Sequence, residues 1–323
     1  MLILFQRGEV IDTEISYTIQ IFGDLVATLF SPEFIYENQV AVWEWKTGRL
    51  LLNVFGEDLD SFSLLSQQHI IFALCDDHGD PMLLAANLAK ETSDCQEFCK
   101  VKSGKYFRYP ALGEDSYLHS LQLRADPGPL CGENQNVPFY QDTKDFILIL
   151  NMWVTEDEIA KHWIHFIPSQ LLLSLIESES RVASDWWLSR DTRMYLARDQ
   201  NDTHVWVCYV FGTRFVTSAY PLTRASGKGE MTIALYDFNR LALRRGAQTS
   251  AASDMPGSVV SLSNQIHSGH PFCEDAETSL PYWTNVAYVD AGKNYDGHCT
   301  MMCCEDNIVI VDLESRMYRV LVF

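Results

Sequence analysis

The sequence predicts a mainly β protein built from consecutive antiparallel sheets, and three observations support this. Apolar segments of roughly five to eight residues, rich in Val, Ile, Leu, Phe, Tyr and Trp, recur along the chain. Turn-forming residues separate these segments. The 3.6-residue periodicity that is typical of helices is sparse. With 323 residues, 47% of them hydrophobic, the chain is long enough to bury a large core.

The expected elements follow in chain order. Strands are expected at residues 25–30, 40–45, 50–55, 61–65, 69–74, 82–88, 118–123, 146–154, 205–210, 214–218, 231–238, 286–289, 308–313 and 318–323. Two short helices are expected between strands, at residues 155–163, which begin with a threonine and acidic residues, and at residues 169–177, which follow Pro168. The basic segment 240–245 is interpreted as a further strand with solvated ends.

Residues 40–52 form the clearest predicted hairpin. Alternation along a strand places Ala41, Trp43 and Trp45 on one face. A Lys-Thr-Gly triplet ending at Gly48 then supplies a short turn, in which the glycine can adopt a positive φ before an apolar return strand. The segment therefore predicts a hairpin like the outer strand pair of a propeller blade.

Three segments share an aliphatic or aromatic alternation that ends in an acidic residue, at Glu44, Asp237 and Asp312. Their separations are close to multiples of about 38 residues, near the ~40-residue period of a WD-type blade. We therefore expect a WD40-like β-propeller, incomplete or irregular in part, with short helical insertions. Residues 1–323 are expected to form a single propeller-like domain whose long loops lie at about residues 89–117, 125–145, 223–230, 246–258 and 268–280.

Several motifs, in the same order along the chain, resemble the propeller portion of fungal F-box proteins. They lie at residues 43–48, 61–65, 69–71, 121–129, 206–215, 235–239 and 318–323. The resemblance implies a non-catalytic protein-interaction module, like the part of an SCF-type ubiquitin ligase that recognises the substrate. It also implies a helical F-box upstream, and no such segment precedes Leu25. Binding to the ligase adaptor is therefore not expected of this chain. In addition, Gly56-Glu57 stands where the family pattern has Gly-His.

Two other classes of function remain open. One is a structural scaffold or an inactive remnant. The other is a propeller hydrolase, which would bring acidic or histidine side chains together at a central channel. The residues that would do so here are Asp76, Asp80, His267 and His298.

Charge and composition narrow the partners and the compartment. The 24 basic and 43 acidic residues give a formal net charge of −19, which opposes generic binding to nucleic acid or to anionic membranes. No signal peptide is visible, and the apolar runs are too short to cross a bilayer. The nine cysteines lack the spacing of a disulfide framework. We therefore expect a soluble protein with reduced thiols in the cytoplasm or nucleus, and a protein partner of unidentified type.

One group of residues has the types and short spacing of zinc ligands. Its members are His267, His270, Cys273, His298, Cys299, Cys303 and Cys304. However, no Cys-x-x-Cys pair is present, and cysteines beside strand-like sequence usually serve as small buried apolar residues. We therefore assign no metal, cofactor or catalytic residue.

The remaining motifs have structural interpretations as well. Cys95 and Cys99 lie in a polar loop. An incidental pairing of two loop cysteines is favoured there over a redox role. Residues 76–80 are favoured as a turn between strands over a cation-binding loop, and residues 156–158 as the solvated start of a helix. Residues 226–229 lack the full pattern of a phosphate-binding loop. The tryptophans are expected between blades, and any that prove exposed become candidates for protein binding; they are Trp43, Trp45, Trp163, Trp186, Trp187, Trp206 and Trp283.

Overall fold

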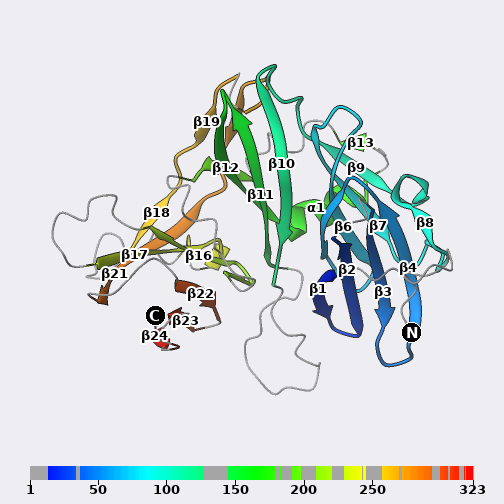
Figure 1. Cartoon of the computed structure of the whole chain (residues 1–323). Helices are drawn as coiled ribbons and strands as arrows, with labels where there is room; N and C mark the ends of the chain where they lie inside the picture. The colour runs from blue at the N-terminus through cyan, green and yellow to red at the C-terminus, as the bar shows by residue number, and fades with distance from the viewer. Residues whose placement is uncertain are drawn as a thin grey trace.

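The computed structural model of the chain is mainly β (Figure 1). It describes residues 14–33, 37–126, 145–178, 182–183, 191–197, 209–219, 229–241, 243–244, 257–268, 271–292, 299–304, 306–312, 316 and 318–322. In this part of the chain, no helix is long and apolar enough to cross a membrane.

Among the described residues there are five sheets of three or more strands, which we number by the chain order of their first strands. The first sheet has the order β1-β2-β3-β4-β8, with β1 (Ile15–Phe22), β2 (Leu25–Pro32), β3 (Asn38–Glu44), β4 (Arg49–Gly56) and β8 (Gln96–Glu97). The second has the order β13-β9-β7-β6-β5, with β5 (Leu59–Leu64), β6 (His69–Cys75), β7 (Pro81–Asn87), β9 (Lys105–Arg108) and β13 (Val182–Ala183). The third has the order β10-β11-β12-β14, with β10 (Ser116–Arg124), β11 (Ile147–Glu156), β12 (Ile159–Pro168) and β14 (Arg193–Leu196).

The last two sheets lie on the left in Figure 1. The fourth sheet has the order β15-β16-β17-β21-β18, with β15 (Val210–Phe211), β16 (Arg214–Ala219), β17 (Gly229–Asp237), β18 (Ser258–Val260) and β21 (Tyr282–Gly292). The fifth sheet, β22-β23-β24, comprises β22 (Cys299–Cys303), β23 (Asn307–Asp312) and β24 (Tyr318–Val322). A separate hairpin joins β19 (Asn264–Ile266) to β20 (Ala276–Thr278), and the helical elements are α1 (Ser169–Ile176) and the short 3₁₀ helix η2 (Phe98–Lys100).

The first strands of the sheets lie close to one another. β1 contacts β5, β5 contacts β10, and β15 contacts both β11 and β22. Side chains reinforce the contact between β1 and β5, since Gln20 accepts a hydrogen bond from the Leu64 backbone N–H at 2.6 Å and donates to Ser63 Oγ at 3.3 Å. The sheets therefore pack in series, mainly through their first strands, while the third and fourth sheets meet through β11 and β15.

The predicted hairpin between β3 and β4 is confirmed. The backbone N–H of Gly48 donates to the Glu44 carbonyl at 2.8 Å, and Gly48 has φ +72°. The pairing register shifts between Val42 and Trp43. The extra residue, Leu51, lies on β4, so the alternation along β3 is kept: Ala41 in the middle of the strand is buried, Trp43 is half-buried and Trp45, at the turn, is exposed.

The predicted helix at residues 155–163 is wrong, because this segment is the turn of the hairpin between β11 and β12. Ten residue pairs join these strands, and the last pair is Glu156 with Ile159. The two turn residues, Asp157 and Glu158, both have positive φ, at 50° and 65°, as in a type I′ turn. Glu156 is buried and not a solvated helix start. The acidic run resembles a helix N-terminus, but the long apolar ladder on both sides outweighs this local preference.

Other local predictions have mixed outcomes. The helix predicted after Pro168 is confirmed as α1. The strand expected at 240–245 is wrong, because residues 240, 241, 243 and 244 are helical. The helix begins where Asn239 Oδ1 accepts a hydrogen bond from the Leu241 N–H at 2.9 Å.

The expected loops differ in part from the structure. The loop expected at residues 89–117 is interrupted by β8, η2 and β9, and the loop at 268–280 is interrupted by β20. Much of the other three expected loops, at residues 127–144, 223–228 and 246–256, lies outside the described residues.

Two hydrophobic clusters meet at the third sheet. We call the cluster formed mainly by sheets one to three the first cluster, and the cluster formed by sheets three to five the second cluster. Successive residues of β11 point to opposite sides, so that Leu148 and Leu150 belong to the first cluster, whereas Ile147 and Ile149 belong to the second. The third sheet is therefore buried on both faces.

Candidate functional site

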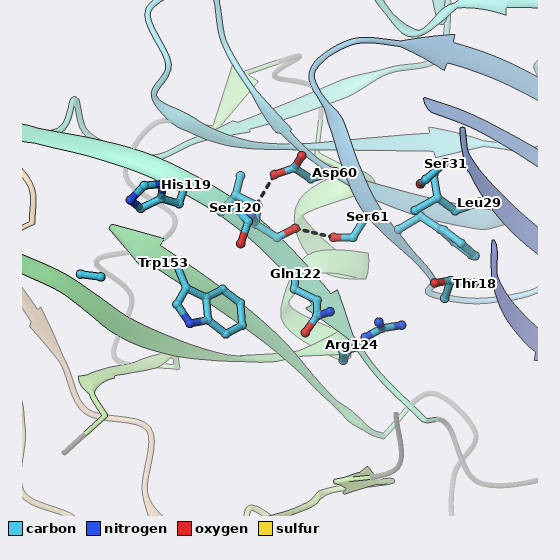
Figure 2. A pocket seen from close by; sticks show the side chains of 13 residues that line it. Thr18, Leu29, Ser31, Asp60, Ser61, His119, Ser120, Gln122, Arg124 and Trp153 are labelled. Atoms are coloured by element: carbon cyan, nitrogen blue, oxygen red, sulfur yellow. Dashed lines mark hydrogen bonds between the residues drawn. The ribbon is translucent and has the colours of Figure 1, made fainter. Parts of the chain in front are cut away.

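The candidate site is a cavity of about 600 Å³ where strands of the first three sheets meet (Figure 2). It lies at the first strands β1, β5 and β10 and extends to β2, β11 and β12. Its lining residues are Thr18, Leu29, Ser31, Asp60, Ser61, Phe62, His119, Ser120, Leu121, Gln122, Arg124, Trp153 and Ala160. Hydroxyl, amide, charged and aromatic groups therefore share one cavity.

Two neighbouring side chains of β5 hold β10 in place at the cavity. Asp60 Oδ2 accepts the backbone N–H of Leu121 at 2.8 Å. Ser61 Oγ donates to the Leu121 carbonyl at 3.0 Å and accepts the N–H of Leu123 at 2.7 Å. Burial raises the pKa of Asp60, and the charge of Asp58 adds to this, while the bond from the Leu121 N–H opposes it. These bonds give partners to backbone groups of β10 on the side where, among the described strands, its own sheet ends.

An ordered aromatic wall closes another side of the cavity. The indole of Trp153 stacks on the His162 imidazole, with centroids 4.4 Å apart and planes 3° apart. His162 Nε2 pairs with Asn151 Oδ1 at 2.9 Å, and Asn151 Nδ2 donates to the Tyr209 hydroxyl at 2.7 Å. Burial lowers the pKa of His162 to about 4, so the imidazole is neutral at neutral pH. The chain of bonds fixes the ring on which Trp153 rests.

The polar part of the lining comes from β10. The β-bulge between Leu118 and Ser120 turns His119 out of the regular alternation, and His119 Nε2 pairs with Thr155 Oγ1 at 2.6 Å. Gln122 and Arg124 follow on the same strand, and both side chains are half-buried. Within the described residues, Arg124 takes part in no ion pair, so its guanidinium is free to bind a visiting acceptor.

The polar side chains at the cavity are anchored separately. The hydrogen bonds of Asp60, Ser61 and His119 go to backbone groups and to Thr155, and among the described residues none joins these three side chains to one another. The cavity therefore offers separate donors, acceptors and an aromatic face.

The candidate zinc ligands do not come together in the part of the chain that the structure describes. Here no group of three or more His, Cys, Asp or Glu residues is placed to hold a metal ion. His267 and Cys273 are exposed, whereas Cys303 is 3% exposed and burial raises its thiol pKa to about 12. Cys303 thus has the expected role of a small buried residue. His270 and His298 lie outside the described residues, as does the side chain of Cys299.

The acidic segment 76–80 is a turn between β6 and β7, as predicted. Asp76 Oδ1 accepts the N–H groups of His78 and Asp80, at 2.9 and 3.1 Å, and Gly79 has φ +82°. Asp80 Oδ1 accepts the Leu112 N–H at 2.8 Å. Asp76, Asp80 and His267, three residues of the hydrolase hypothesis, do not line the cavity.

The remaining sequence candidates are separate features. Cys95 and Cys99 are both free thiols, and burial raises the pKa of each. Residues 226–228 lie outside the described residues. Of the tryptophans, Trp163 is buried, Trp43 and Trp283 are half-buried and Trp45 is 55% exposed; Trp186, Trp187 and Trp206 lie outside the described residues.

Sequence reasoning missed the main residues of the cavity, including Asp60, Gln122, Arg124 and Trp153. Asp60 resembles an ordinary turn residue, and Gln122 and Arg124 resemble the solvated positions of a strand. The one available signal was the polar residue at every second position of β10. This pattern is equally typical of a strand whose polar side faces solvent, so it did not indicate a cavity.

Compared with known proteins, the chain matches no protein-family model and no curated protein sequence.

Proposed function

We propose that this protein is a non-catalytic protein-interaction module that receives a segment of its partner in the cavity at β1, β5 and β10. The observation that carries the proposal is the composition of the lining, in which the half-buried Arg124 and Gln122 stand near the ordered Trp153. Arginine and tryptophan are enriched among the residues that dominate binding energy at protein interfaces. The resemblance to the substrate-recognition part of fungal F-box proteins supports the same function.

The finer architecture that we propose is a WD40-like β-propeller, incomplete or irregular, in which each sheet is one blade. Two features support it. Antiparallel neighbours in the sheets are mostly consecutive in sequence, and first strands contact each other between the first and second, the second and third, and the fourth and fifth sheets. In addition, Glu44 and Asp237, which the repeat pattern pairs, each end the third strand of a five-stranded sheet. A blade origin explains this equivalence, since repeats conserve the position of a strand within its unit.

Affinity purification with variants of the cavity tests the function. Proteins that co-purify with the unaltered chain are quantified by mass spectrometry beside Arg124→Ala and Gln122→Ala. Arg49→Ala is the matched control, because Arg49 is an exposed arginine at the β3–β4 turn. We expect a partner whose recovery falls about tenfold or more with either cavity variant, since ~1.4 kcal/mol corresponds to tenfold in affinity. Equal recovery with all four proteins would contradict the proposal.

A second purification tests the proposed relation to a ubiquitin ligase. The chain is compared with a version extended upstream to any F-box segment. We expect the ligase adaptor only with the extended version. Recovery of the adaptor with this chain alone would overturn the expectation that the docking element lies elsewhere, and recovery with neither would contradict the resemblance.

A further inference from the structure

Arg124 brings a positive charge into the cavity, and the acidic groups nearest to it do not balance this charge. Asp126, two residues further along the chain, has a pKa that burial raises, whereas an adjacent guanidinium would lower it. Asp60, the acidic residue of the lining, also has a raised pKa, and its carboxylate accepts the Leu121 N–H. Within the described residues, the half-buried guanidinium therefore has no counter-ion.

The polar groups on the other side of Arg124 are neutral at neutral pH. Burial raises the pKa of Tyr209 to about 12, and the charge of Arg124 opposes this, which shows that the guanidinium and the phenol interact. The Tyr209 hydroxyl accepts from Asn151, which pairs in turn with the neutral His162. Partial burial disfavours a charge that has no counter-ion, and an anion that enters the cavity offsets this cost.

The cavity follows strand β10 and joins this charge to the aromatic wall. Its lining includes β10 residues from His119 to Arg124. The register places Ser120 and Arg124 on one face of the third sheet, with Trp153 opposite Ser120. Figure 2 shows Trp153, Gln122 and Arg124 in this order along the strands. At about 3.3 Å per residue, the positions of Trp153 and Arg124 are separated by roughly 13 Å along β10.

We propose that the partner segment lies extended along β10, with an Asp or Glu carboxylate on the Arg124 guanidinium and an aromatic or large aliphatic side chain on the Trp153 indole. This inference rests on the proposed function, because it names the chemistry of the segment that the cavity receives. An extended segment advances by about the same length per residue as β10, so the two side chains are four residues apart in the partner. The guanidinium can hold a carboxylate through two parallel hydrogen bonds.

A single guanidinium favours a carboxylate over a phosphoryl group. A carboxylate carries one negative charge, which Arg124 balances, whereas a phosphorylated side chain carries about −1.5 to −2 at pH 7. Among the described lining residues, no other arginine or lysine supplies a second positive charge. The excess charge of a phosphoryl group would therefore meet Asp60 and the field of a chain whose net charge is −19.

Selection from a library of random peptides tests this chemistry. Short linear peptides, fused to a phage coat protein through their C-terminus so that only side chains supply carboxylates, are selected on the unaltered chain. Peptides whose binding falls with Gln122→Ala are taken as cavity binders, a criterion that does not involve Arg124. We expect these peptides to be enriched in Asp or Glu four residues away, in either direction, from an aromatic or large aliphatic residue.

Exchange of charge then separates the contact from a loss of fold. A selected peptide, and a version with lysine in place of its acidic residue, are synthesised and titrated against the unaltered chain and Arg124→Glu. The acidic peptide should lose about tenfold or more in affinity for Arg124→Glu. The lysine peptide should bind this variant more tightly than it binds the unaltered chain, which an unfolded variant could not do. The control is Arg49→Ala, which removes an exposed arginine at the β3–β4 turn and should leave both affinities unchanged.

The outcomes distinguish this inference from the proposed function. Cavity binders that lack an acidic residue, or that keep their affinity for Arg124→Glu, would overturn the inference and leave the proposed function in place. Failure to obtain any peptide whose binding depends on Gln122 would contradict both. A peptide with phosphoserine in place of the acidic residue should bind more weakly than the carboxylate peptide, and tighter binding would overturn the assignment of a carboxylate.

Discussion

The first and second clusters lie on opposite sides of one sheet, yet they are built differently. The first cluster is largely aliphatic, with leucine, isoleucine, valine and alanine from three sheets. The second cluster is organised around aromatic rings, in which Phe166 contacts Tyr195, Phe215, Tyr236 and Phe238 at centroid distances of 4.7 to 6.3 Å. One side of the sheet thus packs against aliphatic side chains, among which substitutions of similar volume are tolerated. The other side packs against aromatic rings, whose contacts depend on the relative orientation of the rings.

Strand β12 shows how this division arises from alternation. Trp163 and Ile167 point into the first cluster, and Ile164 and Phe166 into the second. Each side also holds one buried histidine of this strand: His165 pairs with Tyr109 at 2.6 Å, and His162 pairs with Asn151. A single strand therefore contributes both packing and a polar anchor to each cluster.

Substituting one phenylalanine in each cluster gives the largest expected effect. Phe72 of the first cluster and Phe166 of the second are both fully buried, so each Phe→Ala change should lower the free energy of unfolding by about 3–5 kcal/mol. The Phe→Leu changes should distinguish the two clusters. Phe166→Leu should lower the free energy of unfolding more than Phe72→Leu, because it also loses ring contacts worth about 0.5–1.5 kcal/mol each. Urea unfolding measures both. An equal loss for the two leucine variants would remove the distinction between the clusters.

A smaller effect is expected at the buried end of the third sheet. Glu156 is 2% exposed and accepts hydrogen bonds from Lys161 Nζ at 2.7 Å and from Trp163 Nε1 at 3.0 Å. Glu156→Gln should cost about 1–3 kcal/mol, because a charged acceptor is lost in a buried site. The control is Lys46→Met, which breaks an exposed pair with Asp24 and should cost less than about 1 kcal/mol. Similar losses in thermal unfolding would show that burial adds nothing to the Glu156 contacts.

The two histidines of β12 predict acid sensitivity on both sides of the sheet. Burial lowers the pKa of His162 to about 4 and that of His165 to about 3. The unfolded chain binds protons on these residues below about pH 6.5 and the folded chain does not, so stability falls as the pH is lowered from 6.5 to 5. Each histidine should contribute about 1.4 kcal/mol for each pH unit once its unfolded form is protonated.

Replacing one histidine at a time assigns this dependence to a side of the sheet. His162→Gln and His165→Gln should each reduce the slope of unfolding free energy against pH by about 1.4 kcal/mol per pH unit, which corresponds to one bound proton. The control is His78→Gln, which removes an exposed histidine outside both clusters. A slope that is the same in all variants would mean that neither histidine is held neutral by the clusters.

The sequence predicted local features well and distant ones poorly. Short apolar runs predicted most strands, Pro168 marked the start of α1, and Gly48 marked a turn, because each signal lies within a few residues of the structure that it predicts. The cavity could not be predicted in this way. Asp60, Gln122 and Trp153 come from three strands, and only the packing of the second sheet against the third brings them together.

The two hairpin turns offer the smallest and most specific prediction. Gly48 adopts positive φ at no steric cost, whereas Asp157 and Glu158 adopt it against the preference of residues with a side chain, which is why the second turn resembled a helix start. Asp157→Asn with Glu158→Gly should therefore stabilise the protein by about 0.4–1 kcal/mol, and Gly48→Ala should destabilise it by a similar amount or more. Thermal unfolding measures both changes. If the Asn-Gly turn were destabilising, the side chains of Asp157 and Glu158 would have to contribute contacts that outweigh their backbone strain.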